Sequence, residues 1–312
     1  MPALGRRLAP AASTALPYPA ASRRRPALLI VGCGDVGLRV ARLLRGRWRL
    51  LALTTSTERV EALRRAGVVP LLGDLDRPAT LGRLAGVADA VLHLAPPPAQ
   101  GVADTRTAHL LRALARSGRV RRVVYGSTSG VYGDCAGALV DETRAIRPAT
   151  DRARRRADAE ARLRRFGRAT GTVVTILRIP GIYAPDREGG TPRERLKKGT
   201  PVLRTEDDVY TNHIHANDLA RACVAALWRG GSQRVFHVSD DSEIRMGDYI
   251  DLAADLYGMP RPQRITRDEA QAQLPPSLLS FMGESRRLDN TRLKRELRIR
   301  LRHPTVATGL AS

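Results

Sequence analysis

Aromatic side chains are scarce in this chain: Phe, Trp and Tyr make up 4% of its 312 residues. Single-stranded nucleic acids stack on aromatic rings, so this scarcity weakens a nucleic-acid interpretation of the net charge of +22. Nearly all of that charge is arginine, because the only lysines are Lys197, Lys198 and Lys294. Basic residues recur from Arg6 to Arg302 without concentrating in one segment. We interpret the charge as spread over solvated faces and expect no nucleic-acid partner, with a continuous basic groove as the alternative.

Cysteines and long apolar runs are also few. Cys33, Cys135 and Cys223 have neither the spacing of a metal site nor the even number of a disulfide framework. A reducing compartment is the simplest setting for such a chain. No apolar run approaches the roughly 18 residues that are needed to cross a bilayer. We therefore expect a cytoplasmic protein with no metal ion and no membrane segment.

The first 25 residues contain no acidic side chain and are rich in Ala, Pro and Arg. Pro10, Pro17 and Pro19 break the only candidate apolar segment, which argues against a secretory signal. We expect residues 1–25 to be a disordered N-terminal extension. An organellar leader and a misassigned start fit the composition as well.

From Ala27 onward, short apolar runs alternate with amphipathic stretches. Runs such as ALLIVG, RLLALT and ADAVLHLA are typical of strands buried on both faces, and DVGLRVARLLRG has helical spacing. Further helices are expected around residues 77–85 and 102–117. This alternation predicts an α/β fold, a Rossmann-type doubly wound parallel sheet over residues 26–180. Residues 181–312 interleave less regularly, and we expect them to add late core elements and a smaller C-terminal substrate lobe.

A glycine-rich loop lies between the first predicted strand and helix. Gly32, Gly34 and Gly37 form G-x-G-x-x-G, with Cys33, Asp35 and Val36 between them. The three glycines permit a tight turn, a close approach of a pyrophosphate to the backbone, and close packing of helix on strand. The helix N-terminus then offers amide donors to the phosphates. In this setting the pattern predicts dinucleotide binding, and a plain tight turn is the alternative.

The end of the second predicted strand bears on the choice of cofactor. An acidic residue commonly binds the free ribose 2′-OH of NAD at this place. Here Thr54, Thr55, Ser56 and Arg59 are present instead, although Glu58 is close in sequence. Hydroxyls and a guanidinium suit a 2′-phosphate, so the sequence favours NADP over NAD.

Several short motifs occur in a fixed order: GDL at 73–75, LHLA at 92–95, STSGVYGD at 127–134, VDE at 140–142, LRIPGIYAP at 177–185 and HIHANDLARA at 213–222. The series resembles the extended short-chain dehydrogenase/reductases, the epimerase/dehydratase-like group. The resemblance implies a Rossmann core that binds NAD(P). It places Asp74 and Leu75 beside the adenine, Arg178 among the cofactor-binding residues, and the loop after Arg178 over the nicotinamide. It also implies that the cofactor is lined by His93, Leu94 and Ala95.

The same resemblance implies a Ser or Thr, then a Tyr, with a Lys four residues later on one helix. Thr128 matches the hydroxyl position, but Arg152 and Arg156 stand at the Tyr and Lys positions. We expect these two arginines to face the cofactor cleft, where they hold ribose or an anionic group, and Arg154 and Arg155 to be solvated. Arginine has no acceptor and keeps its proton, so it does not replace a tyrosine as general acid. Losing that acid typically forfeits about 10² to 10⁴ in rate.

Other candidate groups are weaker. Tyr132 is more typical of a packing residue than of an acid, and Cys135 has no evident His partner. His213 and His215 lie on one strand face without a third metal ligand at useful spacing.

The sequence thus predicts an NAD(P)-dependent oxidoreductase that acts on a small carbonyl or sugar-like substrate. The atypical arginines leave a second hypothesis open, a non-catalytic NAD(P)-binding protein that senses redox state. A homodimer is compatible with either hypothesis.

Overall fold

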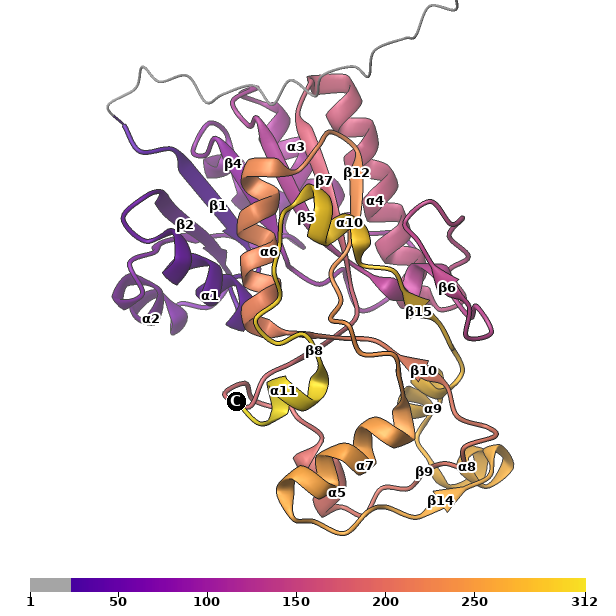
Figure 1. Ribbon diagram of the computed structural model, residues 1–312. Coiled ribbons are helices and arrows are strands. Elements are labelled where there is room, and N and C mark those ends of the chain that lie inside the picture. Colours follow the sequence, from indigo (N-terminus) through magenta and orange to yellow (C-terminus); the bar gives the residue numbers. More distant parts are fainter. Residues whose placement is uncertain (1–23) are drawn as a thin grey trace, which may run out of the picture.

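The computed structural model describes residues 24–312 and is built around a seven-stranded parallel sheet (Figure 1). The predicted N-terminal extension therefore lies outside the described residues, apart from its last two positions. The strand order is β12-β7-β5-β4-β1-β2-β3, and the direction of winding reverses between β1 and β4. The doubly wound Rossmann-type sheet is thus confirmed. Its strands are β1 (Ala27–Val31), β2 (Arg49–Thr54), β3 (Val69–Leu72), β4 (Ala90–His93), β5 (Arg122–Thr128), β7 (Val173–Ile179) and β12 (Arg234–His237).

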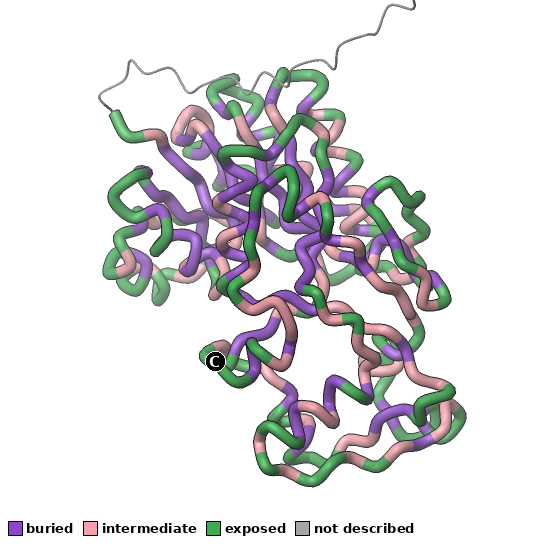
Figure 2. The backbone as a smooth tube through the Cα atoms, in the orientation of Figure 1, coloured by how far each residue is buried: buried purple, intermediate pink, exposed green. Residues whose placement is uncertain are grey.

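Helices cover both faces of this sheet, and Figure 2 shows the buried backbone concentrated between them. One face carries α1 (Asp35–Leu44), α2 (Arg59–Arg65), α6 (Ala216–Arg229) and α10 (Thr291–Glu296). The other carries η1 (Pro78–Leu84), α3 (Thr105–Ala115) and α4 (Asp151–Thr170). The helix expected around residues 77–85 is a 3₁₀ helix, because Pro78 and Gly82 are both poor α-helix formers.

A smaller lobe follows the carboxyl edge of the sheet (Figure 1). Its helices are α5 (Arg193–Lys197), α7 (Met246–Tyr257), α8 (Arg267–Gln273), α9 (Pro276–Met282) and α11 (Val306–Leu310). Short strands pair beside them: β8 (Gly181–Tyr183) with β11 (His213–His215), β9 (Val202–Leu203) with β14 (Arg264–Ile265), and β10 (Tyr210–Thr211) with β13 (Ile244–Arg245). After β5 come η2 (Ser129–Tyr132) and β6 (Leu139–Val140), which pairs with β15 (Arg287–Leu288).

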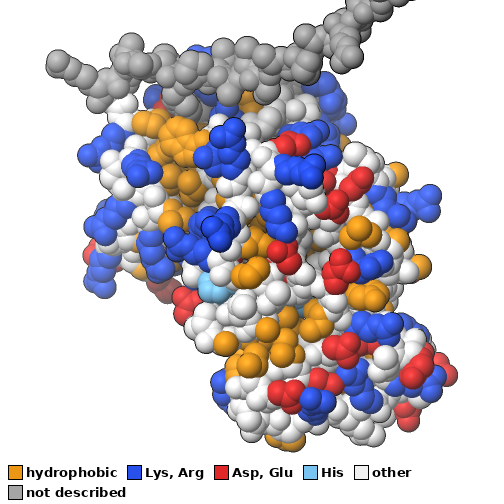
Figure 3. All heavy atoms as spheres, viewed as in Figure 1, with side chains coloured by type: hydrophobic (Ala, Val, Ile, Leu, Met, Phe, Trp, Pro, Cys, Tyr) orange, Lys and Arg blue, Asp and Glu red, His pale blue; other side chains and the backbone are white. Residues whose placement is uncertain are grey.

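Charged side chains of both signs are interspersed on the face shown in Figure 3. Many arginines have a carboxylate partner close in sequence; for example, Arg154 lies 2.7 Å from Asp151. Within residues 24–312, no helix is both long enough and apolar enough to span a membrane.

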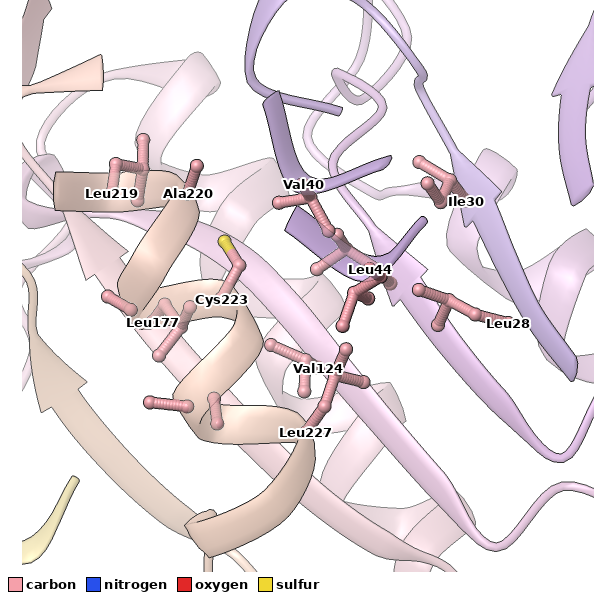
Figure 4. Close-up of a cluster of buried hydrophobic side chains, with 14 of the residues drawn as sticks. Leu28, Ile30, Val40, Leu44, Val124, Leu177, Leu219, Ala220, Cys223 and Leu227 are labelled. Carbon is pink, nitrogen blue, oxygen red and sulfur yellow. The ribbon is translucent and has the colours of Figure 1, made fainter. Parts of the chain in front are cut away.

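The alternation of strand side chains produces two separate cores. Leu28 and Ile30 of β1 pack with Val40 of α1 and Leu227 of α6 on one face of the sheet (Figure 4). The intervening residue Leu29 belongs to the core on the opposite face. Both cores immobilise the strands, so the loops at their carboxyl ends are held in fixed relative positions.

Candidate functional site

The glycine-rich loop joins β1 to α1 and forms an open cradle. Gly32 has φ +88°, and a Cβ on it would lie 2.4 Å from the backbone N of Ala95, so only glycine is accommodated there. Gly34 is different, because a Cβ there would meet no heavy atom of the described residues within 4 Å. It is the N-cap residue of α1 and makes no side-chain cap, which leaves first-turn amides available to a ligand. At Gly37 a Cβ would lie 3.2 Å from Ile30 Cγ2, consistent with close packing of helix on strand.

A pocket of about 240 Å³ opens beside this cradle at the carboxyl ends of β1, β2 and β3. Many of the predicted cofactor residues line it, namely Gly32, Cys33, Thr54, Arg59, Asp74, Leu75 and Ala95. Arg59 spans the loop, donating from Nη2 to the carbonyl oxygen of Cys33 at 2.5 Å. The Cys33 thiol is buried, which raises its pKa to about 11 and keeps it un-ionised. The pocket and the open glycine backbone beside it fit the adenosine and pyrophosphate of a dinucleotide.

Besides Gly34 and Gly37 of the cradle, four other predicted cofactor residues do not line this pocket. His93, the last residue of β4, is buried with Nε2 2.9 Å from Thr107 Oγ1, and Leu94 is half-buried beside it. Asp35 and Val36 are half-buried in the first turn of α1. Asp35 pairs with Arg39, at 2.9 Å.

Arg178, the remaining predicted cofactor residue, does not line this pocket either. It is 3% exposed, and its Nη2 lies 2.8 Å from Glu160 Oε2. Its Nη1 donates to the Tyr132 hydroxyl at 2.6 Å. With its donors committed to these partners, Arg178 fastens β7 to α4 rather than presenting its charge to a ligand.

A larger pocket, of about 590 Å³, lies between the sheet and the C-terminal lobe. The core side contributes Thr128 and Arg152, two of the predicted catalytic residues. The lobe side contributes side chains that sequence reasoning did not identify, including Tyr210, Phe281, Glu284 and Arg286. They carry no motif and lie 40 or more residues beyond α4, so only the folded chain shows that they share one pocket with Thr128.

The two arginines at the Tyr and Lys positions have different surroundings. Arg152 is exposed in the larger pocket, with its guanidinium 5.7 Å from the centroid of the Phe281 ring. Arg156 is half-buried and points to the sheet, donating to the Gly126 carbonyl at 2.8 Å and the Tyr125 hydroxyl at 3.1 Å. Thr128 caps η2 by accepting from the Gly130 N–H at 3.2 Å. Arg152 and Thr128 therefore share the pocket, whereas Arg156 supports the wall behind it.

Of the two arginines expected to be solvated, Arg154 and Arg155, only the first is exposed. Arg154 is exposed and pairs with Asp151. Arg155, expected to be solvated, is only 8% exposed and donates to the carbonyl oxygen of Gly101. The loop around Gly101 folds over α4, and this long-range contact leaves no local sign in the sequence.

The loop that follows β8 is tied to the glycine-rich cradle. Buried Arg39 of α1 donates to Asp186 at 2.7 Å and to Asn217 at 2.5 Å. Arg187 lines the larger pocket and lies 3.5 Å from the second oxygen of Asp35. The first turn of α1 is thereby linked to the wall of the larger pocket.

Four buried histidines make the fold sensitive to acid. Burial lowers the pKa of His93 and of His213 to about 3, and that of His215 and of His237 to about 4, from an ordinary 6.5. Between pH 4 and 6.5 the unfolded chain therefore binds protons at these sites that the folded chain does not. Burial of Asp240 has the opposite effect, because it raises the pKa of this carboxyl group to about 7. Between pH 4 and 7 the folded chain therefore binds a proton at Asp240 that the unfolded chain does not.

We expect the free energy of unfolding to fall on acidification from pH 6 to pH 4.5. Each histidine contributes up to about 1.4 kcal/mol per pH unit, so four histidines against one aspartate leave a slope of roughly 4 kcal/mol per unit. Urea denaturation at several pH values measures this slope. Asp240→Asn removes the opposing contribution and should steepen it, and a stability independent of pH in this range would contradict the assignment.

Comparison with known proteins agrees with this geometry. The model of the NAD dependent epimerase/dehydratase family matches residues 28–239, more than half of the chain. The chain belongs to this family. The family match covers the glycine-rich cradle, both arginine positions of α4 and the strands of the main sheet through β12.

Individual relatives cover most of the chain. Protein YeeZ of Escherichia coli (strain K12) is 27% identical over 243 residues, which are 75% of this chain and 85% of that protein. A conserved protein of unknown function from Silicibacter pomeroyi is 30% identical with TM-score 0.77, over 92% of this chain and 97% of that one. UDP-glucuronic acid 4-epimerase from Bacillus cereus, in complex with NAD, is 18% identical with TM-score 0.72, over 91% and 94%. That last likeness shows the fold alone.

Proposed function

We propose that this family member is an NADP(H)-dependent oxidoreductase that acts on a small carbonyl or sugar-like substrate. The observation that carries the proposal is the arrangement of two pockets along one edge of the sheet. The glycine cradle and the smaller pocket suit the dinucleotide, and the larger pocket, which contains Thr128, suits the substrate. The NAD in the structure of the Bacillus cereus relative supports a dinucleotide in this family.

The bound cofactor would supply a hydride to the carbonyl carbon. The Thr128 hydroxyl, held at the end of β5, is positioned to hydrogen-bond the reacting oxygen. The proton that completes the reduction would come from water through this hydroxyl, since Arg152 and Arg156 do not exchange protons. Arg156, fixed to the Gly126 carbonyl, would place a positive charge behind the site and stabilise developing negative charge on that oxygen.

A preference for NADP follows from Arg59. No carboxylate of the described residues forms an ion pair with this exposed guanidinium, and it lies in the same pocket as Thr54 and Ser56. A guanidinium without a carboxylate partner, beside hydroxyls, suits a ribose 2′-phosphate.

We expect Arg59→Gln to weaken NADPH binding about tenfold and to leave NADH binding within twofold, because only the former has the 2′-phosphate. Isothermal titration calorimetry measures both affinities. Arg65→Gln is the matched control on the same helix, since Arg65 is exposed and paired with Glu61 at 3.3 Å. Equal losses for the two cofactors would count against the assignment.

The arginines at the Tyr and Lys positions favour a second candidate, a protein that binds NADP(H) without turnover and reports redox state to a partner. Oxidation of NADPH against a panel of aldehydes, ketones and oxidised sugars, followed at 340 nm, separates the two. Turnover with any member that is lost in Thr128→Val supports the enzyme. Tight cofactor binding with no oxidation across the panel would overturn it in favour of the redox-state reporter.

A further inference from the structure

The larger pocket contains one arginine whose charge is not compensated. Of the charged side chains that line it, Glu284 lies 2.8 Å from Arg286, and Arg187 lies 3.5 Å from Asp35. Arg152 makes no hydrogen bond or ion pair with any residue in 24–312, and its guanidinium lies against the Phe281 ring instead. Its guanidinium therefore has donors available on the wall that also carries Thr128.

The surroundings of Arg152 are unfavourable for an isolated positive charge. Partial burial and the neighbouring charges of Arg156 and Arg155 lower its pKa, while the more favourable charge of Glu284 is shared with Arg286. A cation in such a place gains from a negatively charged ligand, because the anion restores both hydrogen bonds and charge balance. Tyrosine at this position would leave the pocket without that positive charge.

We propose that Arg152 binds the carboxylate or phosphate of an anionic carbonyl substrate, so that the carbonyl lies within reach of Thr128. This inference deepens the proposed function and rests on it for the identity of the reacting group. The planar guanidinium pairs with either anion through two parallel hydrogen bonds. The Phe281 ring, 5.7 Å from the guanidinium carbon, limits its motion from the lobe side.

Matched pairs of ligands test the proposal on the full chain saturated with NADP⁺, which has no hydride to donate and therefore cannot reduce the carbonyl. One pair is 4-oxobutanoate and butanal, and the other is glyceraldehyde 3-phosphate and glyceraldehyde. We expect at least one anion to bind about tenfold more tightly than its neutral partner in calorimetry. The pair that shows the difference identifies the anion as carboxylate or phosphate.

Variants assign the effect to one side chain. Arg152→Gln should reduce the affinity for the anion to that of the neutral partner, and Arg152→Lys should restore part of it, while NADP⁺ affinity stays the same in both. Arg154→Gln is the matched control, because Arg154 is exposed on the same helix and pairs with Asp151. Equal binding of anion and neutral partner by the unmodified protein, or an anion preference that survives Arg152→Gln, would overturn the proposal.

This outcome is independent of the oxidoreductase test. Anion binding that depends on Arg152, without NADPH oxidation, would support the anion site and contradict the proposed reaction. Oxidation of NADPH by neutral aldehydes as efficiently as by the anions would support the reaction and contradict the anion site.

Discussion

Arg178→Met is expected to lower the free energy of unfolding by about 3–5 kcal/mol, the usual effect of removing one partner of a buried ion pair. Arg178 and Glu160 are 3% and 2% exposed, and they join β7 to α4 beneath the larger pocket. Without the guanidinium, the Glu160 carboxylate would keep only the hydroxyl of Ser127, at 2.7 Å, as a hydrogen-bond donor. The Tyr132 oxygen would lose a donor as well. Urea denaturation followed by circular dichroism measures the change.

The matched control is Arg154→Met, the same substitution in an exposed ion pair of α4. Its effect should stay below about 1 kcal/mol, because solvent already screens that pair. Adding Glu160→Leu to Arg178→Met should recover part of the lost stability, since no buried charge then remains unpaired. Similar effects of the two single variants would show that the buried pair has no special role in holding β7 against α4.

The buried pair also illustrates what a sequence does not show. The family resemblance implies that Arg178 contacts the cofactor, whereas in the structure its guanidinium is bonded to Glu160 and to the Tyr132 hydroxyl. Glu160 lies 18 residues earlier in the chain, and only the packing of α4 on the sheet brings the two charges together. The same reason explains Arg155, which looked like its exposed neighbour Arg154 until the loop at Gly101 was seen to cover it.

The main sheet was predictable because its signals are local. Each strand is a short apolar run, and the turn at Gly32 needs a residue without Cβ, which the sequence states directly. Thr128 and Arg152, on the first wall of the larger pocket, were identified through the family resemblance, whose matching motifs lie on one loop and one helix. The opposite wall could not be predicted, because Phe281 and Glu284 reach the pocket through the path of the whole lobe.

Gly34→Asp is expected to weaken the binding of NADPH and of NADH by at least about 100-fold, because a like-charge contact with the pyrophosphate costs several kcal/mol. The new carboxylate would lie over the first-turn amides of α1, the donors that the diphosphate requires. Calorimetry of both cofactors with the variant and the unmodified protein measures the loss. An affinity within threefold of the original would place the dinucleotide somewhere else.

This substitution separates binding from folding unusually well. A Cβ at Gly34 meets no described atom within 4 Å, and aspartate is a preferred N-cap residue, so the melting temperature should stay the same or rise. Gly82→Asp is the control, because a Cβ at Gly82 is equally unobstructed and Gly82 lies outside both pockets. It should change neither cofactor affinity nor fold. Stability retained together with affinity lost would identify the open backbone at Gly34 as the place where the diphosphate binds, since a general disturbance of the sheet would lower both.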